Sequence, residues 1–162
     1  TSGCGRGITF TDAAALKNLP PNKSLITISP EEIQNLLKEF RCISELFMKT
    51  GGVHSAALAD QKRIHLFAED IGRHNAVDKV IGRCLLGGIP LEDKVLLPSG
   101  RACYGMAVKA IRTSIPIIAT ISSPTSLAVQ LAEEHGLTLI GYLRGGRMNV
   151  YTHPGRVQIT LG

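Results

Sequence analysis

The residues best suited to chemistry form segment 69–75, which reads Glu-Asp-Ile-Gly-Arg-His-Asn. The segment lies between an apolar run at 64–68, which predicts a strand, and a helical pattern of apolar residues from Ala76 onward. Open α/β sheets bind ligands at such turns, beyond the carboxyl ends of their strands. There Arg73, His74 and Asn75 can face a ligand near a helix N-terminus, where free N–H groups and the helix dipole favour an anion. The alternative is a capped helix whose charges are only solvated.

Two further turns carry polar residues directly after predicted strands. Ser99 and Arg101 follow one apolar strand, and Ser122 and Thr125 follow the next. If these strands run parallel, all three turns lie at one edge of the sheet and a shared site follows from topology. Taken alone, the turn at Ser122 and Thr125 is more often only a helix cap.

The last polar cluster spans residues 144–153. Two glycines between Arg144 and Arg147 predict a hairpin turn between two strands. An arginine beside a glycine on a turn is suited to binding a phosphate or a carboxylate. The alternative is a hairpin whose arginines are solvated.

The four cysteines divide into one exposed candidate and three less favourable ones. Cys4 lies in a glycine-rich loop, where the neighbouring Arg6 favours the nucleophilic thiolate; the alternative is an incidental cysteine near a chain end. Cys42 and Cys84 fall in helical patterns and are expected to be buried and inert. We therefore expect Cys4 to be the only cysteine needed for function, with Cys103 as its nearest rival because Cys103 follows the Ser99–Arg101 turn.

The sequence does not indicate a zinc site or binding to nucleic acid or membranes. No cysteine pair has zinc-knuckle or C-x-x-C spacing, and the turn at 98–103 offers at most one thiolate where the zinc deaminases need two. The formal net charge is +5 and no long Lys/Arg run occurs, which argues against nucleic-acid or membrane binding through a basic tract. Scattered cysteines, without a signal peptide or apolar span, indicate the cytoplasm.

The remaining sequence predicts one α/β domain over residues 1–162. Segment 1–22 is expected to be a mobile loop that carries Cys4. From residue 63 to 143, strands and helices alternate, which predicts parallel pairing with helices on both faces of a sheet. The expected helices are 30–50, 73–86, 102–112 and one that starts at Ser123; the expected strands are 53–59, 63–68, 94–97, 115–121, 137–143 and 148–152, and a closing strand could follow at 157–160.

Four stretches resemble the formate dehydrogenase accessory sulfurtransferase (FdhD/NarQ) family: 69–79, Ser99-Gly100-Arg101, 122–127 and 148–153. The resemblance implies a three-layer, cytidine-deaminase-like α/β/α fold with a mixed, mostly parallel sheet and no zinc. It also implies a homodimer that carries sulfur from a cysteine desulfurase, through a cysteine persulfide, to the molybdenum (or tungsten) bis-guanine-dinucleotide cofactor of formate dehydrogenase. Family members usually have an additional N-terminal region, and this chain starts without a Met, so we expect an upstream part to be missing.

The resemblance also assigns roles to residues. Cys4 matches the cysteine that can carry the persulfide, whereas Gly7 stands where the family loop usually has a second cysteine. The alternative is therefore a chaperone that binds the cofactor without sulfur transfer; a weaker one is a nucleotide-binding relative of the deaminases with another substrate. Guanine nucleotides such as GDP should act as analogues of the cofactor. The expected cofactor-binding residues are Met148, Asn149, Val150, Tyr151, Thr152 and His153 from the family motif, with Arg73, His74, Asn75, Ser99, Arg101, Ser122, Thr125 and Arg147 from the turns.

Overall fold

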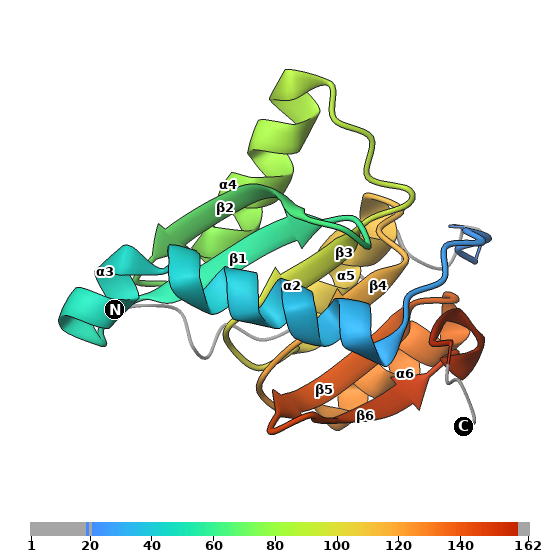
Figure 1. The fold of residues 1–162 in the computed structure, drawn as a ribbon. Coiled ribbons are helices and arrows are strands. Elements are labelled where there is room, and N and C mark those ends of the chain that lie inside the picture. Colours follow the sequence, from blue (N-terminus) through green and yellow to red (C-terminus); the bar gives the residue numbers. More distant parts are fainter. Residues whose placement is uncertain (1–18, 20, 159–162) are drawn as a thin grey trace.

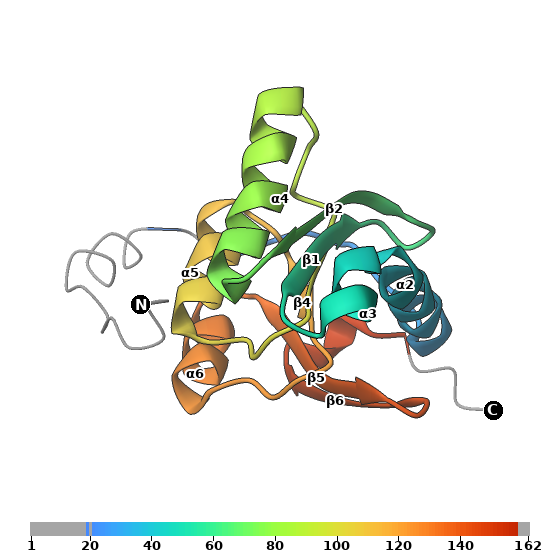
Figure 2. The ribbon, with the colours of Figure 1, turned by 90° about the vertical axis from the view of Figure 1, so that its left-hand side faces the viewer.

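A six-stranded sheet runs through the molecule, with helices on both faces. The structure, a computed structural model, describes residue 19 and residues 21–158. The strand order is β2-β1-β3-β4-β5-β6 (Figure 1). Turned by 90°, the molecule shows α2 and α3 on one side of the sheet and α4, α5 and α6 on the other (Figure 2). The predicted helical layers on both faces are thus confirmed within the described residues.

The strand directions differ from the prediction of a mostly parallel sheet. β1 (His54–Ala59) and β2 (Ile64–Asp70) form an antiparallel hairpin, and β1 also pairs antiparallel with β3 (Val95–Pro98). β4 (Ile117–Ala119) pairs parallel with β3 and with β5 (Thr138–Arg144), and β6 (Arg147–Thr152) is antiparallel to β5. The prediction was wrong because the hairpin inserts β1 between β2 and β3.

The strands that matter for the site nevertheless point the same way. β1 is reversed relative to both of its neighbours, so β2 runs in the same direction as β3, β4 and β5. The turns after β2, β3 and β4 therefore share one edge, as the sequence predicted. We call this side, where β2, β3, β4 and β5 end, the carboxyl edge; it lies on the left in Figure 1.

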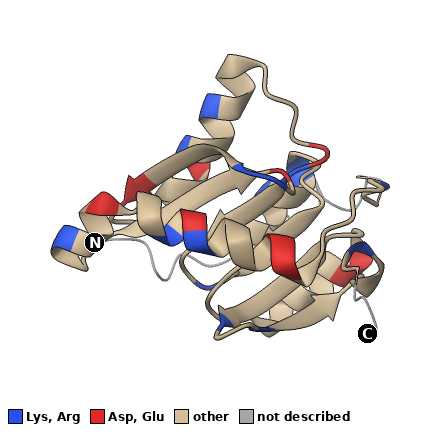
Figure 3. Cartoon of the chain, in the orientation of Figure 1, with Lys and Arg blue, Asp and Glu red and all other residues tan. Residues whose placement is uncertain are grey.

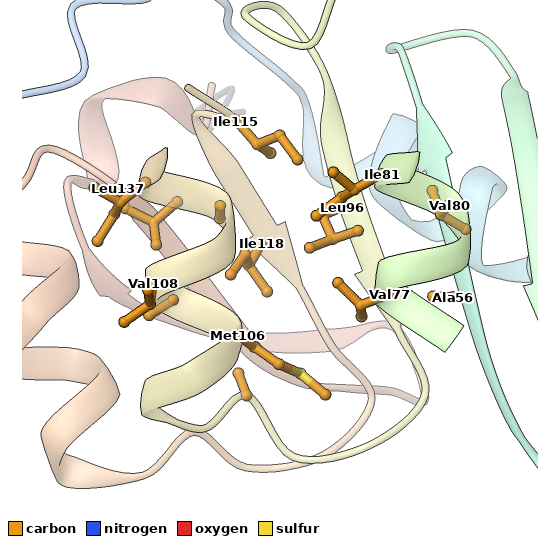
Figure 4. Packing of buried hydrophobic residues seen from close by; sticks show 14 of the residues in the cluster. Ala56, Val77, Val80, Ile81, Leu96, Met106, Val108, Ile115, Ile118 and Leu137 are labelled. Carbon is orange, nitrogen blue, oxygen red and sulfur yellow. The ribbon is translucent and has the colours of Figure 1, made fainter. Parts of the chain in front are cut away.

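Three helices pack on one face of the sheet. Their buried side chains meet those of the strands in an aliphatic core that includes Val77, Leu96, Met106 and Ile118 (Figure 4). The helices are α4 (Arg73–Gly87), α5 (Tyr104–Arg112) and α6 (Ser126–Glu134). Each follows one strand directly, so its first turn is placed at the carboxyl edge.

The opposite face is covered mainly by α2 (Pro30–Ile43), which buries Ile33, Leu36, Leu37 and Phe40 against the sheet. These residues occupy one helical stripe, as predicted. The stripe ends earlier than expected, because the helix breaks at Ser44 and a separate short α3 (Glu45–Thr50) follows.

Two side chains near this break are exposed. Phe47, on α3, is 48% exposed. Cys42, expected to be buried, is exposed, because it lies two residues, about 200°, past Phe40 around α2. Two other helices, α5 and α6, begin later than predicted. After the short 3₁₀ helix η1 (Pro154–Arg156), Val157 forms an isolated parallel bridge with Ile28, and the described residues end at 158, within the closing strand that was expected at 157–160.

The start of α2 offers a test of the fold. The Ser29 hydroxyl accepts a hydrogen bond from the Glu32 amide at 3.1 Å, and the Glu32 carboxylate accepts one from the Ser29 amide at 2.7 Å. Ser29→Ala should lower the free energy of unfolding in urea by about 1 kcal/mol, because an orphan amide loses its partner. Lys38→Ala, at an exposed site on the same helix, should change it by less than about 0.5 kcal/mol. Equal losses in the two variants would contradict this role of Ser29.

Candidate functional site

The turn between β2 and α4 is shaped by Asp70. Its carboxylate accepts hydrogen bonds from the Gly72 amide (2.8 Å) and the Asn75 side chain (3.1 Å), and it pairs with Lys79 at 2.6 Å. The Lys79 hydrogen bond, then those of Gly72 and Asn75, lower the pKa of Asp70 to about 2. Gly72 has φ −96°, and an added Cβ would lie 3.1 Å from the Asn75 amide nitrogen. The close approach of the Asn75 side chain therefore explains why residue 72 is a glycine. Asn75 itself stabilises the turn through its hydrogen bond to Asp70.

Arg73 and His74 point from this turn to the next one. A Cβ added at Gly100 would lie 2.9 Å from Arg73 Cδ, so the arginine passes directly over the glycine. His74 Nε2 lies 2.9 Å from Sγ of Cys103, the N-cap residue of α5. These contacts join the β2–α4 and β3–α5 turns into one surface.

Cys103 is a half-buried thiol with an unusual environment. Burial by itself would raise its pKa, but the His74 hydrogen bond, the Met106 amide and the electrostatic attraction of His74 and Arg73 outweigh burial and lower the pKa from 9.0 to about 6. Cys103 is therefore mostly thiolate at neutral pH, the form that acts as a nucleophile. The sequence ranked Cys103 behind Cys4 as the functional cysteine, because His74 lies 29 residues away and no sequence motif has a cysteine and a histidine at that spacing.

Ser99 is tied to β1. Its hydroxyl accepts a hydrogen bond from the Ser55 amide at 2.9 Å and lies 3.2 Å from His54 Nδ1. Burial, and then the charge of Arg73, lower the pKa of His54. His54 is a site residue that the sequence analysis missed, because it is the first residue of β1 and lies far from any motif in the sequence. Beside it lies a hollow of about 460 Å³, lined mainly by apolar side chains that include Phe40, Phe47, Met48, Ile71 and Ile121.

The third turn, after β4, is bonded to the second. The Thr120 hydroxyl donates to the Gly100 carbonyl at 2.8 Å, and Ala102 forms a parallel bridge with Pro124. The Thr125 hydroxyl accepts from the Ala128 amide at 3.3 Å as the N-cap of α6, so Thr125 acts as a helix cap in this structure. The three turns form one continuous carboxyl edge, from which Arg101 projects as an exposed side chain.

At its far end the edge meets the β5–β6 turn. The Ser122 carbonyl accepts a hydrogen bond from the Tyr142 amide at 3.0 Å. Tyr142 has φ +55°, a conformation that L-residues avoid and that clusters at functional sites. Arg144 lies 5.6 Å from the centre of its ring, and an open hollow of about 600 Å³ is lined by Tyr142, Arg144, Gly145, Arg147 and Asn149.

Within β6, the side chains of the expected cofactor motif, 148–153, alternate between the two faces of the strand. Met148 and Val150 pack against the core on the α2 side, whereas Asn149 and Tyr151 are exposed. This alternation follows from the period of two in a strand. It leaves Arg147, Asn149 and Tyr151 accessible on one face of β6.

Thr152 and His153 lie at the other end of β6, away from the carboxyl edge. The Thr152 hydroxyl donates to the Leu137 carbonyl at 2.7 Å and accepts from the Leu139 amide at 3.0 Å. His153 Nε2 lies 3.0 Å from the Glu133 carbonyl oxygen, in the last turn of α6. The structure therefore gathers the three turns and Arg147 but not these two residues. Cys4 lies outside the described residues.

Charge is dispersed over the described chain. Both signs of charge occur together on α2 and α4, and basic residues mark the β5–β6 turn (Figure 3). Among the described residues, no three His, Cys, Asp or Glu side chains are placed to hold a metal ion, so the absence of zinc remains a prediction. In the same part of the chain, no helix is long and apolar enough to cross a membrane.

Comparison with known proteins identifies the family. The model of the FdhD/NarQ family matches residues 1–158. The chain belongs to the FdhD/NarQ family. Its relatives include the sulfur carrier protein FdhD of Bacillus subtilis, 44% identical over 157 residues, and that of Thermoplasma acidophilum, 48% identical over 131 residues. These matches cover 97% and 80% of this chain, and 60% and 46% of the two relatives.

A solved structure shows the same FdhD/NarQ architecture. The crystal structure of a candidate formate dehydrogenase accessory protein from Desulfotalea psychrophila superposes with a TM-score of 0.83 at 36% identity. The match covers 90% of this chain and 62% of that protein. The chain thus spans about 60% of the length of the first of these relatives. The cytidine-deaminase-like character of the fold stays an expectation.

Proposed function

We propose that this FdhD/NarQ chain carries sulfur for formate dehydrogenase as a sulfurtransferase. Sulfur from a cysteine desulfurase would be held as a persulfide on Cys4 and passed to the molybdenum (or tungsten) bis-guanine-dinucleotide cofactor, which is the substrate. The names of the relatives support the sulfur-carrier role. We further propose that the protein acts in the cytoplasm as a homodimer.

The observation that carries the proposal is the union of three strand-to-helix turns at the carboxyl edge. His74 contacts Cys103, Thr120 binds the Gly100 carbonyl, and Ala102 bridges to Pro124. The N-termini of α4, α5 and α6 therefore converge, and converging helix N-termini favour a polyanion such as a pyrophosphate. Arg73, Arg101 and Arg147 add guanidinium groups that match phosphate oxygens.

We propose different roles for the residues of the family motif. Asn149 and Tyr151 are exposed beside Arg147 and are free to contact a nucleotide. Met148 and Val150 anchor the strand in the core. The hydrogen bonds of Thr152 and His153 fix the far ends of β5 and α6, so we assign them positioning roles.

Guanine nucleotides should bind at the carboxyl edge without a metal ion. In calorimetric titration with GDP, Arg147→Ala should weaken binding about tenfold to a hundredfold, because one charge-assisted hydrogen bond is worth roughly 1.5–3 kcal/mol. Lys38→Ala, on the opposite side of the sheet, is the matched control and should bind as the wild type. The binding proposal would be wrong if the titration of the wild type with GDP gave no heat of binding, or if the two variants bound GDP with equal affinity.

The competing function is a chaperone that binds the cofactor without transferring sulfur, and one observation favours it. Gly7 occupies the place where the family loop usually has its second cysteine. Mass spectrometry after incubation with a desulfurase and cysteine separates the two. A persulfide on Cys4 supports sulfur transfer, whereas an unmodified Cys4 supports the chaperone.

A further inference from the structure

Cys103 and His74 form a nucleophilic pair that the proposed function does not use. Sγ and Nε2 lie 2.9 Å apart although the two residues are 29 positions apart in the sequence. A thiol within hydrogen-bond reach of an imidazole is the arrangement of an activated cysteine. The pair lies on the carboxyl edge, the surface to which we assign the cofactor.

The surrounding elements hold this pair in place. Cys103 is the N-cap residue of α5, so a negative charge on its sulfur faces the positive end of the helix dipole. The Lys109 ammonium donates to the His74 carbonyl at 3.3 Å and pairs with Asp78 at 2.7 Å, which ties α5 to the first turn of α4. The backbone of α5 packs directly beside the imidazole, since a Cβ added at Gly105 would lie at contact distance, 3.8 Å, from His74 Nε2.

The other two described cysteines lack these features. Cys84 is fully buried in the core, and burial raises the pKa of its thiol. Cys42 is exposed on α2, on the opposite side of the sheet. By contrast, the pKa of Cys103 is lowered to about 6 despite its burial, through His74, the Met106 amide and Arg73. Cys103 is therefore the one described cysteine that combines a thiolate with access.

We propose that Cys103, paired with His74, is a second sulfur-accepting cysteine of this chain, one that takes the outer sulfur of a donor persulfide. The inference rests on the proposed sulfur-carrier function and extends it. It replaces the expectation that Cys4 acts alone, and it gives the chain a second thiol although Gly7 stands where the family loop has one.

The step is balanced without an external oxidant or reductant. The Cys103 thiolate attacks the outer sulfur of a persulfide R–S–SH, where R–S is Cys4 or a small thiol. A new S–S bond forms at Cys103 Sγ while the S–S bond of the donor breaks, and R–S⁻ leaves with the electron pair. The proton stays on the transferred sulfur. The His74 ring can donate its N–H to the attacking thiolate before the step and to the persulfide after it.

The test uses glutathione persulfide as a small donor and mass spectrometry of the cysteine peptides. In Cys4→Ser, we expect Cys103 to gain one sulfur atom at least tenfold faster than the exposed Cys42. In Cys4→Ser/His74→Gln at pH 6, this rate on Cys103 should fall about tenfold or more. Loading of Cys103 no faster than that of Cys42 would overturn the inference.

Two further outcomes separate this inference from the function on which it rests. In Cys103→Ser, loading of Cys4 by a desulfurase should persist; if Cys4 loads there while Cys103 stays unmodified in Cys4→Ser, the proposed function stands and the inference fails. If Cys103 loads in Cys4→Ser but Cys4 never loads in Cys103→Ser, the inference stands and the assignment of Cys4 fails.

Discussion

Replacing Cys4 by serine should reduce the activation of formate dehydrogenase to the level seen without this protein. A hydroxyl cannot hold a sulfane sulfur, so no persulfide forms at the position that receives sulfur from the desulfurase. The half-buried Cys103 does not substitute, because a persulfide on a large protein donor reaches it less easily than a small one does. The assay measures formate dehydrogenase activity in cells that lack their own sulfur carrier and produce either the wild-type protein or Cys4→Ser.

The matched control for this experiment is Cys42→Ser. Cys42 is an exposed cysteine in the last turn of α2 and belongs to none of the three turns of the carboxyl edge, so its replacement should leave activation unchanged. Full activation of formate dehydrogenase by Cys4→Ser would show that Cys4 is not needed for sulfur transfer. Loss of activation in Cys42→Ser would show that the assay responds to any lost thiol.

Replacing His74 by glutamine should move the pH at which alkylation of Cys103 is half-maximal from about 6 towards 9.0. The hydrogen bond and the attraction from His74 are lost, while burial continues to oppose the thiolate. With iodoacetamide at pH 6, a shift all the way to 9.0 would lower the thiolate fraction roughly 500-fold, and the higher nucleophilicity of a more basic thiolate would offset about 20-fold of this. The Met106 amide and Arg73 still favour the thiolate, so the reaction should slow by up to roughly 25-fold.

A histidine elsewhere on the sheet provides the control. His65 lies on β2, where it pairs with Asp60 at 2.6 Å, and it contacts neither turn of the Cys–His pair. His65→Gln should therefore leave the pH profile of Cys103 where it is in the wild type. An unchanged midpoint in His74→Gln would mean that the histidine does not control this thiol.

Local patterns predicted the elements of the fold well, whereas pairing between distant strands was not predictable from them. The start of the expected helix at residue 30 and the two expected strands 53–59 and 63–68 depend on near neighbours, and the structure has a helix that begins at Pro30 and strands at His54–Ala59 and Ile64–Asp70. That β1 lies between β2 and β3 depends on contacts between distant residues, so the sheet was predicted as mostly parallel. The prediction of a shared edge was still correct, because β1 is antiparallel to both β2 and β3, and those two strands therefore point the same way.

The site shows the same division. The three turns were found from the sequence because each carries a dense polar motif. Their individual roles were not, because they depend on which groups the fold brings near: Asn75 bonds to Asp70, Ser99 bonds to Ser55, and His153 lies at the far end of β6. The pairing of His74 with Cys103 likewise joins two turns, and no spacing rule relates them.

If sulfur resides on this chain on its way to the cofactor, a labelled sulfur atom can be followed from the chain to the cofactor. The protein is loaded with a desulfurase and radiolabelled cysteine, purified, and mixed with formate dehydrogenase that holds cofactor without added sulfur. We predict that the label leaves the protein, appears in the extracted molybdenum cofactor, and rises in proportion to dehydrogenase activity. Activity that appears while the label stays on the protein, or without any label being loaded, would contradict this sulfur-carrier role.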